Sequence, residues 1–172
     1  IGNNNTGVTG VSWNVKVMNI AGSSGDESTV VTAYAYALKQ RKIYNQTNGS
    51  QGAFVVATSS SFGVNYGNPA NYPIWCAFYD SLGVNGILSA GATMNINANV
   101  DITGDIPTAC PSDFMISVTN TTNTDVKNSG AAYGPTTIDL GAPGTSILST
   151  ESNGSYSLKT GTSMATPHVA GA

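Results

Sequence analysis

The chain is predicted to be an α/β protein with three α/β/α layers around a mainly parallel sheet. Short apolar segments alternate with helical ones along its 172 residues, an order that pairs successive strands in parallel and packs helices on the sheet faces. Apolar residues make up 40% of the chain, which is enough for the core of one domain. Because it opens on Ile1 rather than Met and stops at Ala172 inside an unfinished helical pattern, we expect residues 1–172 to be one partial domain, truncated at both ends.

Five apolar segments are predicted to be strands, at residues 15–20, 53–57, 86–90, 114–118 and 137–140. The second reads Ala-Phe-Val-Val-Ala, and a continuous apolar run of this kind is typical of a strand buried on both faces. The segment Gly141-Ala142-Pro143-Gly144 follows the fifth strand and is expected to end it.

Three segments are predicted to be helices. The first covers about 28–45, where Asp26 and Ser28 can supply a cap and apolar residues recur at a spacing of three to four. The second opens at Pro73, and the third begins at Ser163. Flexible polar loops follow the second and third strands, at the edge where parallel sheets place their ligand sites.

Composition and charge exclude two classes of partner. Six Lys and Arg against nine Asp and Glu leave a net charge of −3, and the chain has no run of basic residues. The sequence therefore lacks the basic patch that binds nucleic-acid phosphates. The longest apolar runs are about six residues, too short to span a membrane. Only 9% of the residues are charged, and Asn, Ser, Thr and Gly carry the polarity instead, which favours a secreted, extracellular protein.

The two cysteines, Cys76 and Cys110, are expected to form a disulfide because the composition is typical of extracellular proteins. Such a bridge would close a loop of about 34 residues and stabilise the fold by roughly 3–4 kcal/mol. The alternative is a pair of buried thiols. A zinc site is not indicated, because the two cysteines and the single histidine are far apart in the sequence.

Residues 161–171 read Gly-Thr-Ser-Met-Ala-Thr-Pro-His-Val-Ala-Gly and place Ser163 at the start of a helix. The unpaired N–H groups and partial positive charge of a helix N-terminus would stabilise negative charge that develops beside this hydroxyl. Pro167 has no N–H to bond the Ser163 carbonyl, which is left without its helical partner. The plain alternative is a serine that caps an ordinary buried helix.

This eleven-residue segment resembles the nucleophile motif of the subtilisin-like serine proteases, the subtilases. Residues 3–11 resemble the loop that follows the family's catalytic histidine helix, and residues 139–144 resemble the segment shortly before the nucleophile. The resemblance implies a secreted serine endopeptidase of subtilisin-like fold that cleaves polypeptides through an acyl-enzyme on Ser163. It also implies a monomer that requires no cofactor.

The resemblance implies two walls of a substrate cleft. Ser61-Phe62-Gly63 looks like the segment that binds the substrate backbone and lines the pocket for P1, the residue before the cleaved bond. Ser89-Ala90-Gly91 resembles the opposite wall. Neither segment contains an acidic residue, so we expect an apolar side chain at P1.

The chain departs from the family pattern in its catalytic partners. The family's Asp and His motifs would lie before Ile1, and the aspartates present read as caps, turns or surface charges. His168 is five residues after Ser163 on the same helix, about 140° around its axis, so the two side chains diverge. The chain alone is therefore expected to be inactive, with a loss in rate on the order of 10⁶.

The second departure concerns the oxyanion hole, where the family usually has Asn directly after the Ala-Gly pair and this chain has Ala92. Three readings remain. Asn95 or Asn97 folds back from the loop, Thr93 donates, or the enzyme relies on the Ser163 N–H alone. We favour Asn95, because the loop is long enough to bring it back.

The loop that contains Gly2, Asn4, Thr6 and Val8 resembles the family's calcium-binding loop, which implies a structural calcium ion held by oxygen ligands. The alternative is a plain turn of Asn and Gly residues.

Two other classes of protein compete with the protease. An α/β-hydrolase would need its Asp and His after the serine, where only nine residues follow. A degenerate, non-catalytic binding module is supported by Ala92 alone.

Overall fold

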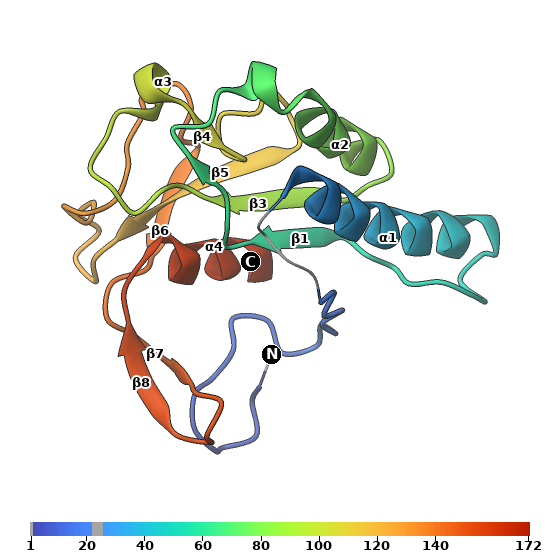
Figure 1. Ribbon diagram of the computed structural model, residues 1–172. Helices are drawn as coiled ribbons and strands as arrows, with labels where there is room; N and C mark the ends of the chain where they lie inside the picture. Colours follow the sequence, from blue (N-terminus) through green and yellow to red (C-terminus); the bar gives the residue numbers. More distant parts are fainter. Residues whose placement is uncertain (1, 22–25) are drawn as a thin grey trace.

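The computed structural model of the protein describes residues 2–21 and 26–172. Its centre is a parallel sheet in the order β1-β3-β5-β6 (Figure 1). The four strands are Ala57–Ser60, Leu88–Ala92, Met115–Thr121 and Leu140–Pro143. Two antiparallel pairs complete the strands: β2 (Val64–Asn65) with β4 (Asp105–Ile106), and β7 (Ile147–Thr150) with β8 (Tyr156–Lys159).

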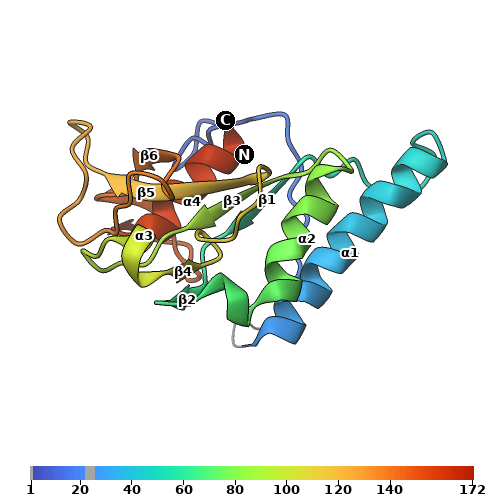
Figure 2. The same cartoon turned by 90° about the horizontal axis from the view of Figure 1, so that it is seen from above.

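Helices cover both faces of the parallel sheet. The helix α2 (Pro73–Gly83) packs on one face, and α1 (Glu27–Gln46) packs beside it (Figures 1 and 2). The helix α4 (Thr162–Gly171) packs on the other face, against all four strands. Two short helices, η1 (Pro69–Asn71) and α3 (Val100–Thr103), lie in the connecting loops. The predicted α/β class with a mainly parallel sheet is confirmed.

Local chemistry explains the first helix. The Asp26 carboxylate accepts hydrogen bonds from the backbone N–H of Thr29 at 2.8 Å and from the hydroxyl of Ser28 at 2.6 Å, so it caps the helix N-terminus. The helix buries Val30, Tyr34, Ala37 and Leu38, a spacing that lies on one face. The helix predicted at 28–45 is therefore confirmed, and it extends one residue further at each end.

The larger core cluster lies between the two helices α1 and α2 and the sheet. The side chains of Trp75 and Tyr79 are almost completely buried there. Their polar atoms are satisfied in a chain of hydrogen bonds, in which the Trp75 indole N–H donates to the Tyr79 hydroxyl at 2.8 Å and the Tyr34 hydroxyl contacts those of Tyr79 and Ser60 at 2.9 and 2.6 Å. Buried polar groups that are fully paired in this way do not weaken a core.

A disulfide joins Cys76 of α2 to Cys110, which follows β4, across a sequence separation of 34 residues. Replacing both cysteines with Ala is expected to lower the free energy of unfolding by about 3 kcal/mol, because the unfolded chain regains the freedom of a long loop. Urea unfolding of the double variant, beside reduced wild-type protein as a control, measures this. A midpoint equal to that of the oxidised wild type would contradict the prediction.

Two predicted strands are corrected by the structure. Residues 15–20 form no strand, and Val15 and Val17 are exposed. Their alternating apolar pattern is not enough, because a strand exists only when another strand pairs with its backbone. The predicted strand 53–57 instead runs over Ala57–Ser60, and Phe54 and Val56, which precede this strand, are 58% and 50% exposed.

The C-terminal third also differs from expectation. Residues 140–143, expected to end the fifth strand, are the strand β6 itself, because their backbone pairs with β5. The β7–β8 hairpin was not predicted, although Asn153-Gly154 between two alternating segments is a recognised hairpin signal.

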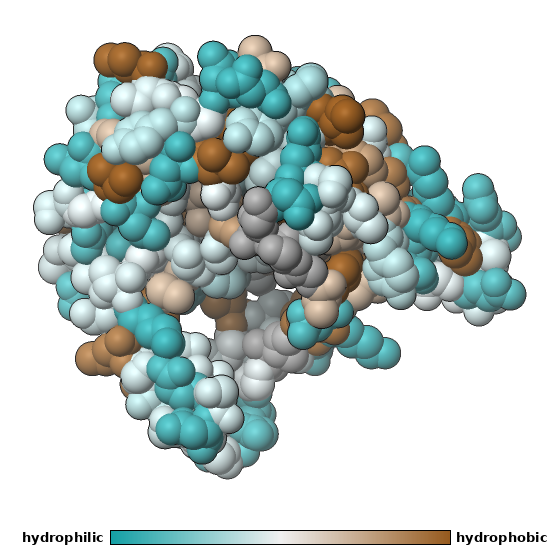
Figure 3. All heavy atoms as spheres, in the orientation of Figure 1, coloured by the Kyte–Doolittle hydropathy of each residue, from teal (hydrophilic) through white to brown (hydrophobic). Residues whose placement is uncertain are grey.

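Hydrophilic side chains cover much of the face shown in Figure 3, with apolar ones scattered among them. Within residues 2–21 and 26–172, no helix has the length and apolarity needed to cross a membrane.

Candidate active site

The helix α4 presents Ser163 in its first turn, at the end of the helix that lies beside the carboxyl ends of β1 and β3. Gly161 is the N-cap residue, in an extended conformation. Ala165 is completely buried against Ala90, Val118 and Ala142, and these small side chains let the helix approach the sheet closely. Ser163 therefore has a half-buried side chain in the first turn of α4, where backbone N–H groups lack helical acceptors.

Ser61, directly after β1, holds the helix start from the other side. Its hydroxyl donates to the Ser163 carbonyl at 2.9 Å, and the Ser163 hydroxyl lies 3.4 Å from the Ser61 carbonyl. The Ser163 carbonyl is the one that Pro167 leaves without a helical donor. Ser61 supplies the missing hydrogen bond and so ties residues 61–63 to the start of α4.

A pocket of about 200 Å³ opens beside Ser163. Ser61, Phe62 and Gly63, the first predicted cleft segment, form part of its lining together with Asn95, the favoured oxyanion donor. A Cβ atom on Gly63 would collide with the Ile106 carbonyl, so only glycine fits where this wall passes β4. The other described residues of the lining are Asn65, Ala92, Thr93, Met94, Asp105 and Thr162.

The second predicted wall is corrected by the structure. Ser89, Ala90 and Gly91 do not line the pocket, because they lie inside strand β3 and are buried. The wall consists instead of residues 92–95, which run from the last residue of β3 into the following loop. Residues within a central strand face packed layers on both sides, and only those at its carboxyl end reach the cleft.

Asn95 is fastened to the first residue of α4. Its side-chain oxygen accepts hydrogen bonds from the Thr162 N–H at 2.9 Å and from the Thr162 hydroxyl at 3.2 Å. The amide NH₂ group therefore points away from Thr162, and no described residue accepts a hydrogen bond from it. Of the other candidate donors, Asn97 binds Lys127 at 3.2 Å, and the Thr93 hydroxyl is buried without a hydrogen-bond partner among the described residues.

His168, the single histidine of the chain, forms a hydrogen bond within its own helix. Its Nδ1 atom lies 2.8 Å from the Met164 carbonyl, the acceptor one helical turn earlier. This arrangement agrees with the expectation that His168 is not a catalytic base. The described residues therefore hold no imidazole that contacts the Ser163 hydroxyl.

Asp105 is the acidic residue of the pocket lining, and the sequence did not identify it as a site residue. It is only 1% exposed, and its Oδ2 atom accepts hydrogen bonds from the Met94 N–H at 2.9 Å and the Thr108 hydroxyl at 2.8 Å. Burial raises the pKa of this carboxyl to about 6. Neither predicted wall segment contains an acidic residue, but the pairing of β4 with β2 brings this carboxyl, which reads as a turn charge in the sequence, into the pocket lining.

The loop expected to bind calcium has two of its oxygens engaged. The Asn4 side-chain oxygen accepts from the Thr6 N–H at 3.2 Å, and the Gly2 carbonyl accepts from the Gly10 N–H at 2.8 Å. Calcium takes about 6–8 oxygen ligands, so the four predicted residues do not by themselves make a full site. Within the described part of the chain, no group of three or more His, Cys, Asp or Glu side chains is placed to hold a metal. The calcium ion stays a prediction.

Fold and site together define an α/β protein with a serine at a helix N-terminus, in a cleft at the carboxyl ends of parallel strands. The model of the subtilase family matches residues 1–172. The chain belongs to the subtilase family.

Known relatives agree with this assignment. The chain is 42% identical to an "Extracellular protease" of Xanthomonas campestris pv. campestris over 51% of its own length, which is 16% of that protein. It is 35% identical to "Proteinase R" of Parengyodontium album over 92% of its length, which is 37% of that protein. Among solved structures, a "cold adapted subtilisin-like serine proteinase" superposes with a TM-score of 0.64 at 28% identity, covering 86% of this chain and 46% of the other. The chain thus spans less than half the length of each of these relatives.

Proposed function

We propose that this chain carries the nucleophile of a secreted serine endopeptidase, which hydrolyses peptide bonds through an acyl-enzyme on Ser163. The observation that carries the proposal is the Ser163 hydroxyl at the N-terminus of α4, beside a pocket sized for a side chain. Family membership and relatives named as proteases support the same reaction. One relative is named "Extracellular protease", which supports secretion.

The reaction begins when the Ser163 oxygen attacks the carbonyl carbon of the scissile peptide bond. The hydroxyl proton must pass to a base, because a neutral serine is a weak nucleophile. The only histidine of the chain, His168, binds the Met164 carbonyl instead. The base is therefore supplied by residues outside these 172, and the isolated chain is inactive.

Two donors stabilise the oxyanion of the tetrahedral intermediate. One is the backbone N–H of Ser163, at the positive end of the helix macrodipole. The other is the NH₂ group of Asn95, whose orientation is set by Thr162. Donors that are fixed before the reaction cost no reorganisation when the charge develops.

The substrate backbone binds along Ser61-Phe62-Gly63, which leaves the edge strand β1 in the direction of the nucleophile. An extended peptide gains main-chain hydrogen bonds at such an edge, and its P1 side chain enters the pocket beside Ser163. The substrate is therefore a polypeptide in extended conformation. A calcium ion on the loop of residues 2–8 would contribute to stability rather than to these steps.

Covalent labelling tests the proposal. The longest natural polypeptide that contains these residues is incubated with phenylmethylsulfonyl fluoride and digested for mass spectrometry. We expect one sulfonyl adduct, on Ser163, and a matching loss of casein hydrolysis, whereas the isolated 172-residue chain is not labelled. A polypeptide that neither hydrolyses casein nor takes up the label would favour the alternative, a non-catalytic binding module.

A further inference from the structure

The pocket beside Ser163 contains a carboxylate that is only half satisfied. Both hydrogen bonds that Asp105 accepts, from Met94 and Thr108, end on the same oxygen, Oδ2. No described residue donates a hydrogen bond to Oδ1. Asp105 lines the pocket although it is only 1% exposed. A polar group of a ligand in the pocket could therefore donate a hydrogen bond to its unpaired oxygen.

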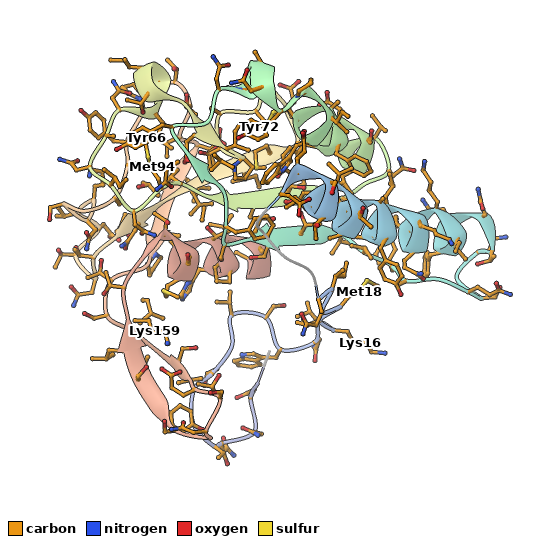
Figure 4. The ribbon with its side chains drawn as sticks, in the orientation of Figure 1. Lys16, Met18, Tyr66, Tyr72, Met94 and Lys159 are labelled. Atoms are coloured by element: carbon orange, nitrogen blue, oxygen red, sulfur yellow. A yellow bond between two sulfur atoms is a disulfide. The ribbon has the colours of Figure 1, made fainter. Side chains whose placement is uncertain are left out.

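No described cation neutralises this carboxylate. Among residues 2–21 and 26–172, the only ion pair joins Lys159 to Glu151 at 2.9 Å, on the β7–β8 hairpin. Figure 4 shows Lys159 and Lys16 well away from Met94, whose N–H holds Asp105. A buried charge normally has a partner of opposite sign, and here the described residues supply none.

The carboxyl is expected to be ionised above pH 7 in spite of its burial. Burial raises the pKa of Asp105 to about 6, so the group is mostly negative at pH 8. No other described residue of the pocket lining carries a carboxyl, imidazole or amino group. The charge in this pocket is therefore set by Asp105 alone.

We propose that Asp105 is a specificity-determining residue that selects lysine or arginine at the P1 position of the substrate. The inference rests on the proposed protease function, which places the P1 side chain in this pocket. Phe62, Ala92 and Met94 line the pocket with apolar surface that suits the aliphatic stem of a long basic side chain. The ammonium or guanidinium group then meets the free oxygen of Asp105, in a charge-assisted hydrogen bond.

The substitution Asp105→Asn separates this role from a purely structural one. Asparagine has the same shape, and its side-chain oxygen can still accept from Met94 and Thr108, while the negative charge is lost. Asp125→Asn is the matched control, because Asp125 is exposed and its positive φ of 59° is one that asparagine tolerates.

The test uses the longest natural polypeptide and peptide p-nitroanilides that differ only in P1: Lys, Arg, Leu or Gln. In wild-type protein, kcat/KM for Lys and Arg is expected to exceed that for Leu by at least about tenfold. Asp105→Asn is expected to reduce that ratio by about 100-fold, because the substrate cation is then buried without its partner, and to leave the Leu substrate within about threefold. Asp125→Asn leaves every value unchanged.

The pH dependence gives a second readout that needs no variant. As the pH falls through 6, Asp105 takes up a proton and the preference for Lys over Leu declines. The ratio of the two kcat/KM values cancels the titration of groups that act on both substrates. A ratio that is constant between pH 5 and pH 8, or a wild-type preference for Leu that Asp105→Asn does not alter, would overturn the proposal. Failure to hydrolyse any of the four substrates would instead count against the protease function.

Discussion

Replacing Ser163 with Ala is expected to lower kcat on peptide substrates by about 10⁶-fold, the size of effect that loss of the nucleophile has in subtilisin. The physical reason is that Ser163 presents a half-buried hydroxyl beside the pocket at the start of α4, whereas the neighbouring Thr162 is completely buried. The assay compares initial rates of the longest natural polypeptide and its variant on the same p-nitroanilide. The fold is expected to survive, because among the described residues the Ser163 hydroxyl makes one long hydrogen bond, to the Ser61 carbonyl at 3.4 Å.

Ser155→Ala provides the control, since Ser155 lies at an exposed position between the strands of the β7–β8 hairpin. Its rate should equal that of the wild type. Circular dichroism melting of both variants shows whether the protein is folded. If Ser163→Ala is folded and retains even a hundredth of the wild-type rate, Ser163 is not the nucleophile.

Replacing Asn95 with Ala is expected to lower kcat by about 10²–10³-fold, the cost of losing one oxyanion donor in subtilisin. KM should change little, because the proposed hydrogen bond strengthens only as negative charge develops on the substrate oxygen. Steady-state kinetics with a single good substrate separates the two constants. Asn97→Ala is the matched control, because Asn97 binds Lys127 rather than the start of α4.

A second substitution removes an ambiguity at Asn95. Alanine also deletes the oxygen that accepts from the Thr162 N–H, so a loss of rate has two explanations. Asn95→Asp keeps an acceptor for Thr162 but has no NH₂ group and adds negative charge. We expect it to be at least as slow as Asn95→Ala. If kcat is unchanged in both variants, the Ser163 N–H acts without Asn95.

Local sequence signals predicted the helices well. The Asp26 cap and the spacing of Val30, Tyr34 and Leu38 are decided within a few turns of one helix, so α1 was placed to within one residue at each end. The third and fourth predicted strands overlap β3 and β5 for the same reason, because a short apolar run between polar loops is a local pattern. The eleven-residue segment around Ser163 likewise indicated the family, since that match depends only on the identity and order of its residues.

Long-range pairing decided the rest. The sequence patterns of residues 15–20 and 140–143 do not show which of the two segments becomes a strand. Hydrogen bonding to another strand decides this, and only residues 140–143 find such a partner. The cleft wall shifted from 89–91 to 92–95 because its position depends on where β3 ends relative to its neighbours. Asp105 reads as a surface turn, and it is buried because β4 pairs with β2 across about forty intervening residues.

The sequence by itself determined the family, the α/β class and the identity of the candidate nucleophile, because each depends on contiguous runs of residues. The tertiary structure alone decided which side chains share the pocket with Ser163, namely Asn95 and the unforeseen carboxylate of Asp105. The physical reason is that a cleft is assembled from the ends of separate strands. Its chemistry is set by residues that are distant in sequence and meet only when the sheet has formed.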